Sequence, residues 1–294
     1  HDVNDKEGIR SNSIYSLLVD DRGAVWVGHF QAGLDYSLYQ NGLFRTYTYP
    51  PLFNSANLSI RSFVNRGQEK VIGSRDGLFY INEATGVVKS FVKPVLTSDL
   101  ILTISFYQGE YYIGTYGGGM MVLNPGTLSL KYFAQGDTEL FQKGHIFCVK
   151  PDAKGNLWIG TSQGLFCYNG QTKQIKHFTS ANSQLPEGNV YEVSFDSTGK
   201  GWIATETGMC IYDPASQSLR SNVFPEGFVH RDKVRTIYED AGHNLYFIRE
   251  KGSLFTSTLT MDRFQNRSIF STLPDNSLMS VIEDNQGWLW VACN

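Results

Sequence analysis

The sequence predicts an all-β protein, a β-propeller of seven four-stranded blades of which the last is incomplete in this chain. The first observation is a repeat, because degraded copies of residues 156–165 recur along all 294 residues. Their central residue falls at Trp26, Lys70, Tyr112, Trp158, Trp202, Tyr246 and Trp290. The intervals of 44, 42, 46, 44, 44 and 44 residues are typical of propeller blades. The second is composition: 14% aromatic residues, 29 glycines and only 18% charged residues favour short strands joined by tight turns.

The first repeat shows the strand pattern most plainly. Residues 13–19, 24–28, 34–39 and 43–48 are short, rich in β-branched or aromatic residues, and bounded by Gly, Asp or Asn, as strands of a meander are. We therefore interpret residues 1–294 as one propeller domain with units at 13–50, 58–93, 99–133, 145–179, 189–224, 233–270 and, in part, 277–294. Nothing before residue 13 resembles the two strands that the last unit lacks, so we expect a fragment of a larger ectodomain.

Charge and cysteine usage argue against several classes of protein. The formal charge is −3 and no run of Lys or Arg could follow a phosphate backbone, so we expect no nucleic-acid partner. No apolar stretch approaches the roughly 18 residues of a membrane span, so we expect no membrane insertion of this fragment. The four cysteines have no CxxC spacing, which indicates buried free thiols rather than a zinc site or disulfides.

A turn with the pattern Asp-x-x-Gly precedes the second strand of several units. It occurs at residues 20–23, 152–155, 196–199 and 284–287. Asp bonds the backbone of such turns and Gly supplies a positive φ, whereas a calcium loop needs further oxygen ligands at alternate positions. We therefore predict turn formation, with neither a metal nor a cofactor. Residues 160–164 match the nucleophile-elbow pattern G-x-S-x-G, but sister segments in other units indicate an ordinary hairpin, so we predict no catalytic residue at Ser162.

The first strand of each propeller unit lines the central channel. In these strands an apolar residue precedes a position that varies freely and holds Tyr15, Arg61, Thr103, Phe147, Tyr191, Arg235 and Met279. Such alternation is typical of core-facing and channel-facing residues. Aromatic faces and Arg side chains suit sugar rings, hydroxyls and carboxylates. The predicted ligand-binding residues are Tyr15, Arg61, Phe147, Tyr191, Arg235 and Glu192.

Two alternatives to this site stay open. Arg61 and Arg235 could serve only to solvate the channel and to pair with neighbours such as Glu192. A β-bulge in the first strands would shift the register and move the prediction to Ser16, Ser62, Glu192 and Thr236. The longest connections, residues 50–54, 134–139 with Phe141, and 225–231, all belong to the face at which the first strands begin. Long loops on one face of a repeat ring commonly carry binding.

The fifth unit resembles a known repeat. Residues 189–193, Asp196, Gly199, residues 202–205 and Gly208 follow the pattern of the two-component regulator propeller repeat, and the resemblance covers essentially the whole chain. It implies the periplasmic sensor region of a hybrid two-component histidine kinase of the Bacteroidetes type, which detects glycan breakdown products. Members of this family resemble two propellers in tandem, followed by an immunoglobulin-like domain, a membrane helix and a cytoplasmic kinase.

The resemblance thus implies a non-catalytic, periplasmic sensor domain that binds an oligosaccharide or other small ligand. Its further expected partners are the adjacent propeller and immunoglobulin-like domains of the parent chain, and a second copy in a homodimer. A propeller lyase or hydrolase is the first alternative, and it predicts a His with a second acid or base at the channel mouth. A protein-interaction scaffold is the second, and it predicts an apolar patch on the rim.

Overall fold

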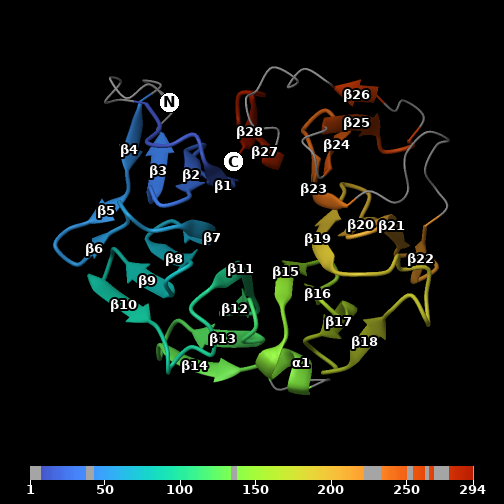
Figure 1. The fold of residues 1–294 in the computed structure, drawn as a ribbon, viewed down its shortest axis with the longest axis horizontal. Helices are drawn as coiled ribbons and strands as arrows, with labels where there is room; N and C mark the ends of the chain where they lie inside the picture. Colours follow the sequence, from blue (N-terminus) through green and yellow to red (C-terminus); the bar gives the residue numbers. More distant parts are fainter. Residues whose placement is uncertain are drawn as a thin grey trace.

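The computed structural model describes residues 8–37, 43–133, 138–221, 233–249, 254–261, 265–267 and 278–293. These residues form an all-β propeller, which confirms the predicted fold class: six four-stranded antiparallel sheets and one two-stranded sheet are arranged in a ring around a central axis (Figure 1). A small hairpin, β5 (Thr48–Tyr49) with β6 (Phe53–Asn54), and the helix α1 (Thr138–Lys143) lie in connections between blades.

The blades follow the chain in order. The first three contain β1 (Ile14–Val19), β2 (Val25–His29), β3 (Leu34–Ser37) and β4 (Phe44–Thr46); β7 (Ile60–Arg66), β8 (Glu69–Ser74), β9 (Leu78–Asn82) and β10 (Val87–Phe91); and β11 (Ile101–Tyr107), β12 (Glu110–Thr115), β13 (Met120–Asn124) and β14 (Ser129–Tyr132). The next three contain β15 (Ile146–Pro151), β16 (Asn156–Thr161), β17 (Gly164–Asn169) and β18 (Ile175–Phe178); β19 (Val190–Phe195), β20 (Gly201–Thr205), β21 (Gly208–Asp213) and β22 (Ser218–Arg220); and β23 (Val234–Glu239), β24 (Asn244–Arg249), β25 (Leu254–Thr258) and β26 (Gln265–Arg267).

The prediction of seven blades is corrected to six four-stranded blades and a separate two-stranded sheet, β27 (Leu278–Glu283) with β28 (Leu289–Cys293). In the described residues β28 pairs only with β27. The two-stranded sheet nevertheless continues the ring, since β27 contacts β23 on one side and β1 on the other. The strands nearest the axis of the ring, which we call the channel, are thus β1, β7, β11, β15, β19, β23 and β27 (Figure 1).

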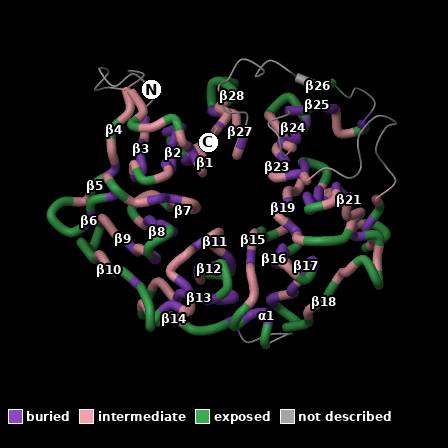
Figure 2. The backbone as a smooth tube through the Cα atoms, in the orientation of Figure 1, coloured by how far each residue is buried: buried purple, intermediate pink, exposed green. Residues whose placement is uncertain are grey.

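The core lies between neighbouring blades. One cluster joins Trp158 and Leu165 of the fourth blade to Val193 and Ile203 of the fifth, and all four are at most 1% exposed. The second strands of the six four-stranded blades are almost wholly buried, whereas the outer strands β10, β14 and β18 are largely half-buried or exposed (Figure 2). Each blade therefore depends on its neighbours to cover its apolar faces, as repeat architectures do.

The repeated Asp turn explains why a tryptophan recurs at the centre of four units. One carboxylate oxygen accepts hydrogen bonds from the turn backbone, as Asp152 does from Lys154 N at 2.9 Å and Asn156 N at 2.8 Å. The other accepts from the aromatic residue six positions later. The four indole Nε1 contacts join Trp26 to Asp20 (3.0 Å), Trp158 to Asp152 (2.9 Å), Trp202 to Asp196 (2.8 Å) and Trp290 to Asp284 (2.7 Å). The turn role predicted for these acids is confirmed.

The central residue of the second unit needs a correction. Ser62 pairs with Gly73 as Ser16 pairs with Gly28, so Val71, and not Lys70, occupies the position of Trp26. Lys70 is 4% exposed, and its ammonium lies 2.8 Å from a Glu83 carboxylate oxygen. The turn between the two strands is shorter in this unit, which shifts the spacing without any change in the strand register.

Candidate functional site

Every innermost strand contains a β-bulge near its start. In β1, Ile14 pairs with His29 and Ser16 with Gly28, which leaves Tyr15 without a partner on β2. The same shift in the other strands gives the bulge positions Tyr15, Arg61, Leu102, Phe147, Tyr191, Arg235 and Met279. Five of the six predicted site residues are therefore bulge residues, and Glu192 follows the bulge of β19. In the third unit the position belongs to Leu102, because Thr103 pairs with Gly114; the prediction of Thr103 was wrong.

In six of the seven described units, a glycine or alanine on the second strand lies opposite the residue that follows the bulge; in the sixth unit Ile248 takes this place. A Cβ atom on Gly160 would lie 2.5 Å from Cys148 Sγ and 2.7 Å from the carbonyl oxygen of Val190, on the next blade. Both distances are shorter than real Cβ contacts allow, so the glycine permits the close approach of two blades. Bulges of this kind bend a strand and redirect its side chains. Here they occur at the end of the channel where the first strands begin.

The bulge residues of the first two blades contact each other. The guanidinium carbon of Arg61 lies 4.6 Å from the centre of the Tyr15 ring, a cation–π distance. On its other side, Tyr15 meets Phe30 edge to face with ring centroids 5.4 Å apart. Tyr15 and Arg61 are both half-buried, so each keeps part of its surface open to solvent.

A second group joins the third, fourth, fifth and sixth units. The rings of Phe147 and Tyr191 are 5.1 Å apart, and the ammonium of Lys233 lies 4.7 Å from the Tyr191 ring centre. His145 contacts Phe147 at 6.2 Å and Tyr116 at 4.0 Å between ring centroids. Tyr116 is 51% exposed. We call these eight residues the channel mouth: Tyr15, Phe30, Arg61, Tyr116, His145, Phe147, Tyr191 and Lys233.

Four residues of the channel mouth were missed by the sequence prediction. Phe30 and Tyr116 come from the hairpins after second strands, whereas His145 and Lys233 come from the segments that lead into first strands. These two kinds of segment meet because Phe30 N donates to Ser13 O at 2.9 Å and Tyr116 N donates to Leu100 O at 3.0 Å. This confirms the prediction that these two kinds of segment lie on the same face. Aromatic residues in the hairpins were the sequence signal that could have identified the missed residues.

The residues that follow the bulges join neighbouring blades. Ser62 Oγ accepts a hydrogen bond from Ile104 N at 3.0 Å, and Thr236 Oγ1 donates to the Met279 carbonyl oxygen at 2.9 Å. Ser16 Oγ would lie 2.2 Å from a Cβ on Gly28, so it too packs between strands. The bulges that the alternative required are present in all seven strands. Two of its four residues, Ser62 and Thr236, nevertheless lie at contacts between blades, and Ser16 packs against β2 of its own blade.

Glu192 is the one acid among the residues that follow the bulges. Its Oε1 lies 3.3 Å from Lys150 Nζ, and both side chains keep some exposure, 21% for Glu192 and 49% for Lys150. Burial raises the pKa of the Glu192 carboxyl, although the Lys150 ammonium acts in the opposite direction. The Glu192 carboxylate in turn raises the pKa of Lys150. The ion-pair partner of Glu192 in the channel is therefore Lys150, rather than the two arginines proposed from sequence.

Of the long loops on this face, residues 50–54 form the β5–β6 hairpin and Phe141 is fully buried in α1. Residues 134–137 of the second loop and residues 225–231 lie outside the described residues. The loops of the described part therefore add no side chain to the channel mouth beyond the eight already named.

A Ser–His–Glu group lies at the other end of the first strands. Glu239 Oε1 is 2.7 Å from His243 Nδ1 and 2.7 Å from Ser197 Oγ, and Ser197 Oγ is 3.1 Å from the same His243 nitrogen. A catalytic triad needs the acid and the nucleophile on different ring nitrogens. The group therefore joins the turns of the fifth and sixth blades. In the described part of the chain no three His, Cys, Asp or Glu residues are placed to hold a metal ion. Nor is any helix there long and apolar enough to cross a membrane.

Comparisons with known proteins agree with the repeat pattern. The family model described as two component regulator propeller matches residues 8–31, 141–163 and 272–294. The chain is similar to the extracellular domain described as that of a hybrid two component system, BT3049, from B. thetaiotaomicron. The two share 21% identity with a TM-score of 0.66, over 100% of this chain and 45% of that one. No curated protein matches the chain in sequence.

Two further solved structures share the fold. PorZ of Porphyromonas gingivalis, described as a surface component of the type-IX secretion system, has 12% identity and a TM-score of 0.75 over 98% of this chain and 46% of its own. YCF48 bound to D1 peptide has 14% identity and a TM-score of 0.66 over 92% of this chain and 85% of its own. This chain thus spans about half the length of the first two structures. The family-model matches thus identify two-component regulator propeller repeats in three segments of the chain, and the propeller fold agrees with the resemblance found in the sequence.

Proposed function

We propose that this chain is an extracytoplasmic sensor domain of a hybrid two-component regulator, that it binds a carbohydrate at the channel mouth, and that it signals to a cytoplasmic histidine kinase. The observation that supports carbohydrate binding is the grouping of aromatic rings and cations at the bulges of adjacent blades, with Arg61 beside Tyr15 and Lys233 beside Tyr191. The family-model matches support the sensor role.

The chemistry of the channel mouth suits an oligosaccharide. Half-buried rings such as Phe147 and Tyr191 present flat apolar faces, which stack on the C–H faces of sugars. The guanidinium of Arg61 and the ammonium of Lys233 supply donors for sugar hydroxyls or uronate carboxylates. Because the bulge positions differ from blade to blade, the mouth is asymmetric, and an asymmetric ligand would bind in one orientation.

The proposed signal is a change in domain arrangement. In this proposal the domain lies in the periplasm, contacts the adjacent propeller and immunoglobulin-like domains of its parent chain, and forms a homodimer. A ligand can shift such an arrangement only as far as its affinities for the two arrangements differ. Long loops and hairpins of the mouth face are suited to sense that difference, since they can contact both ligand and neighbouring domains.

The proposal assigns no chemistry to this domain. A lyase or hydrolase at the channel mouth would need a His with a second acid or base within hydrogen-bonding distance. Among the described residues His145 has aromatic neighbours, Tyr116 and Phe147, and no hydrogen-bond partner for its Nδ1. The His243 group at the opposite end binds both of its partners through a single ring nitrogen. Neither arrangement favours the catalytic alternative.

Thermal unfolding with a panel of neutral and acidic oligosaccharides tests the proposal. A ligand at about 100 times its Kd stabilises the folded state by about 2.7 kcal/mol, which raises the Tm by roughly 5 °C or more. We expect one class of glycan to produce such a shift, and Arg61→Ala and Tyr191→Ala to remove most of it. Arg45→Ala, an exposed arginine on the outer strand β4, is the matched control and should keep the full shift.

Without ligand, Arg61→Ala and Tyr191→Ala should each have a Tm within about 2 °C of that of the unchanged protein, since half-buried mouth residues contribute little to the core. A panel in which no glycan shifts the Tm would overturn carbohydrate binding and favour the scaffold alternative, for which the exposed Trp288 (65%) and Leu289 (42%) are candidate contact residues. A parent gene without a membrane helix and a kinase would overturn the signalling role.

A further inference from the structure

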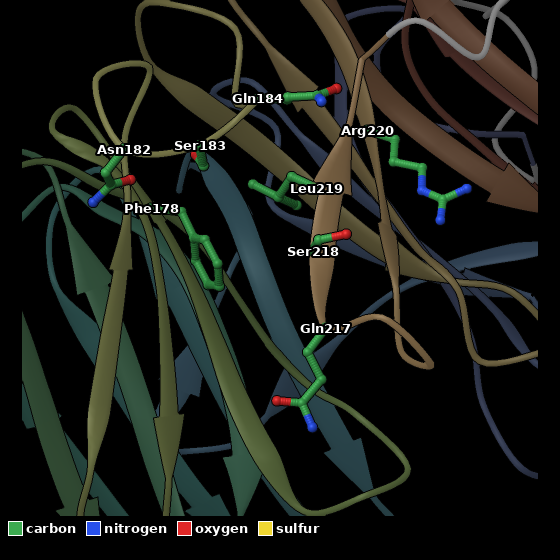
Figure 3. Close-up of a pocket in the computed structure, with 8 residues that line it drawn as sticks. All are labelled: Phe178, Asn182, Ser183, Gln184, Gln217, Ser218, Leu219 and Arg220. Atoms are coloured by element: carbon green, nitrogen blue, oxygen red, sulfur yellow. The ribbon is translucent and has the colours of Figure 1, made fainter.

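A groove runs along the outside of the ring between β18 and β22, the outermost strands of the fourth and fifth blades. It consists of two cavities of about 680 and 350 Å³, and Phe178 and Gln217 line both of them. Figure 3 shows the first cavity, with Phe178, Asn182 and Ser183 on one side and residues 217–220 on the other. Each volume is that of a typical small-ligand site. The groove is separate from the channel mouth, because it lies at the rim and the mouth lies at the axis (Figure 1).

Aromatic side chains form the floor of this groove. The Phe178 ring stacks on the buried Trp158 with centroids 5.9 Å apart and planes 11° apart. Tyr212 contacts the same indole at 4.5 Å. Phe178 and Tyr212 are half-buried, so Trp158 supports both rings from below while their other sides remain accessible. Such fixed rings are suitable platforms for a sugar ring.

The groove is cationic in a protein whose formal charge is −3. Lys154, Lys176 and Arg220 line it, and no Asp or Glu is among the lining residues of either cavity. Arg220 pairs with Asp213 outside the lining at 3.4 Å. The two ammonium groups have only neutral acceptors in the described part of the chain: Lys154 Nζ donates to Pro214 O at 3.4 Å and Lys176 Nζ to Gln217 Oε1 at 3.2 Å. Both lysines thus retain donors and charge for an anion.

The remaining lining side chains are mainly amides and hydroxyls. Asn156, Asn169, Gln174 and Gln184 are amides, and Thr172 and Ser218 carry hydroxyls. Sugar hydroxyls form hydrogen bonds with groups of both kinds. A peptide partner would need apolar pockets for anchor residues, but the first cavity offers only Phe178 and the buried Leu219 as apolar side chains.

We propose that the groove between β18 and β22 is a second binding site, for an acidic polysaccharide. Its sugar rings stack on Phe178 and Tyr212, and its anionic groups pair with Lys154 and Lys176. The site does not depend on the proposed function, since none of its residues belongs to the mouth.

Calorimetric titration of the full chain tests this site. The background is Arg61→Ala with Tyr191→Ala, so that the channel mouth does not contribute. The probes are polygalacturonate, dextran sulfate, neutral dextran and polyglutamate, each at about 50 and 200 mM salt. We expect polygalacturonate or dextran sulfate to bind, more weakly at the higher salt because added salt screens exposed charges. Neutral dextran and polyglutamate should bind at least tenfold more weakly.

Adding Lys154→Gln and Lys176→Gln should raise the Kd about tenfold. Lys131→Gln is the matched control, because Lys131 lies on β14 of the third blade, where Glu110 pairs with it at 3.3 Å. Its Kd should stay unchanged. Equal affinity in the groove variant and the control, or no binding of either anionic polysaccharide, would overturn the proposal. Polyglutamate binding as tight as polygalacturonate would overturn the carbohydrate class and indicate an acidic peptide site.

Discussion

The two ends of the innermost strands share the same backbone geometry from blade to blade but differ in whether the residue type is also repeated. At the end where the strand turns into its neighbour, Asp20, Asp152, Asp196, Asp240 and Asp284 occupy equivalent positions and each accepts a hydrogen bond from the aromatic side chain six residues later. At the end where the strand begins, the bulge geometry is shared by seven strands, but its residue changes between Tyr, Arg, Leu, Phe and Met.

This difference suggests that the turn residues serve the stability of the fold and the bulge residues serve ligand binding. The hydrogen-bonding capacity of the turn aspartates is already satisfied within the fold, since Asp20 accepts hydrogen bonds from two backbone N–H groups, the Trp26 indole and the Asn65 amide. A bulge residue has no partner on the second strand, and its side chain is held by contacts with other mouth residues. A change at the turn should therefore cost folding free energy, whereas a change at the bulge should mainly alter what the channel mouth binds.

The largest effect is expected at the turn. Asp20→Ala leaves several donors without an acceptor around a side chain that is fully buried. It should lower the free energy of unfolding by about 3 kcal/mol and the Tm by roughly 6 °C or more. Asp21→Ala, at the exposed next position, is the matched control and should change the free energy by less than about 0.5 kcal/mol. Urea unfolding of the two variants measures the difference; similar losses would contradict the account.

The stability difference between the unchanged protein and Asp20→Ala should also depend on pH. Burial alone would raise the pKa of the Asp20 carboxyl, but hydrogen bonds from Trp26, Ala24 and Arg22 hold it below its ordinary value of 3.8. A carboxyl whose pKa is lower in the folded state stabilises the protein above the unfolded pKa and loses that contribution as the pH falls through the folded pKa. The stability gap between the unchanged protein and Asp20→Ala should therefore be constant near neutral pH and shrink below about pH 4. A gap that widens on acidification would contradict this sign.

A smaller effect is expected at Gly160, which lies opposite the residue that follows the bulge of β15. Gly160→Ala places a Cβ against Cys148 Sγ and the Val190 carbonyl oxygen, so the two blades must move apart. Overpacking of this kind typically costs about 1–3 kcal/mol. Gly126→Ala is a suitable control, because its nearest contact would be Asn124 Oδ1 at an acceptable 3.4 Å. Chemical unfolding should show the loss for Gly160→Ala alone; equal stability of the two variants would mean that the glycine does not fix the bulge.

The sequence predicted the features that recur. The 44-residue spacing, the Asp turns and the aromatic centres are local and repeated, so the propeller and the lining of the channel by first strands could be inferred without a structure. The bulge was recognisable only as an alternative. Its one signal is the small residue opposite, Gly28, Gly73, Gly114 and Gly160, with Ala204 and Ala292 in later units.

The misses arise from contacts between blades. The register of the second and third units depends on turns that are shorter than the others, which is why Lys70 and Thr103 were misplaced. His145 and Lys233 belong to the channel mouth because each contacts an aromatic residue of a neighbouring blade. A periodic pattern within one unit does not predict contacts between units. The outer groove is likewise formed by two blades, from residues that are unremarkable within each repeat.

Hydrogen exchange in the presence of the glycan that raises the Tm tests the central claim most directly. We expect slower exchange at residues 14–16, 60–62, 146–148 and 190–192, around the channel mouth, because a bound ligand reduces local opening there. Exchange at the turns 20–24, 152–156 and 196–200 should slow only as far as global stability rises. Protection confined to the turns, or to residues 176–184 and 217–220 of the outer groove, would contradict the assignment of ligand binding to the bulge end of the first strands.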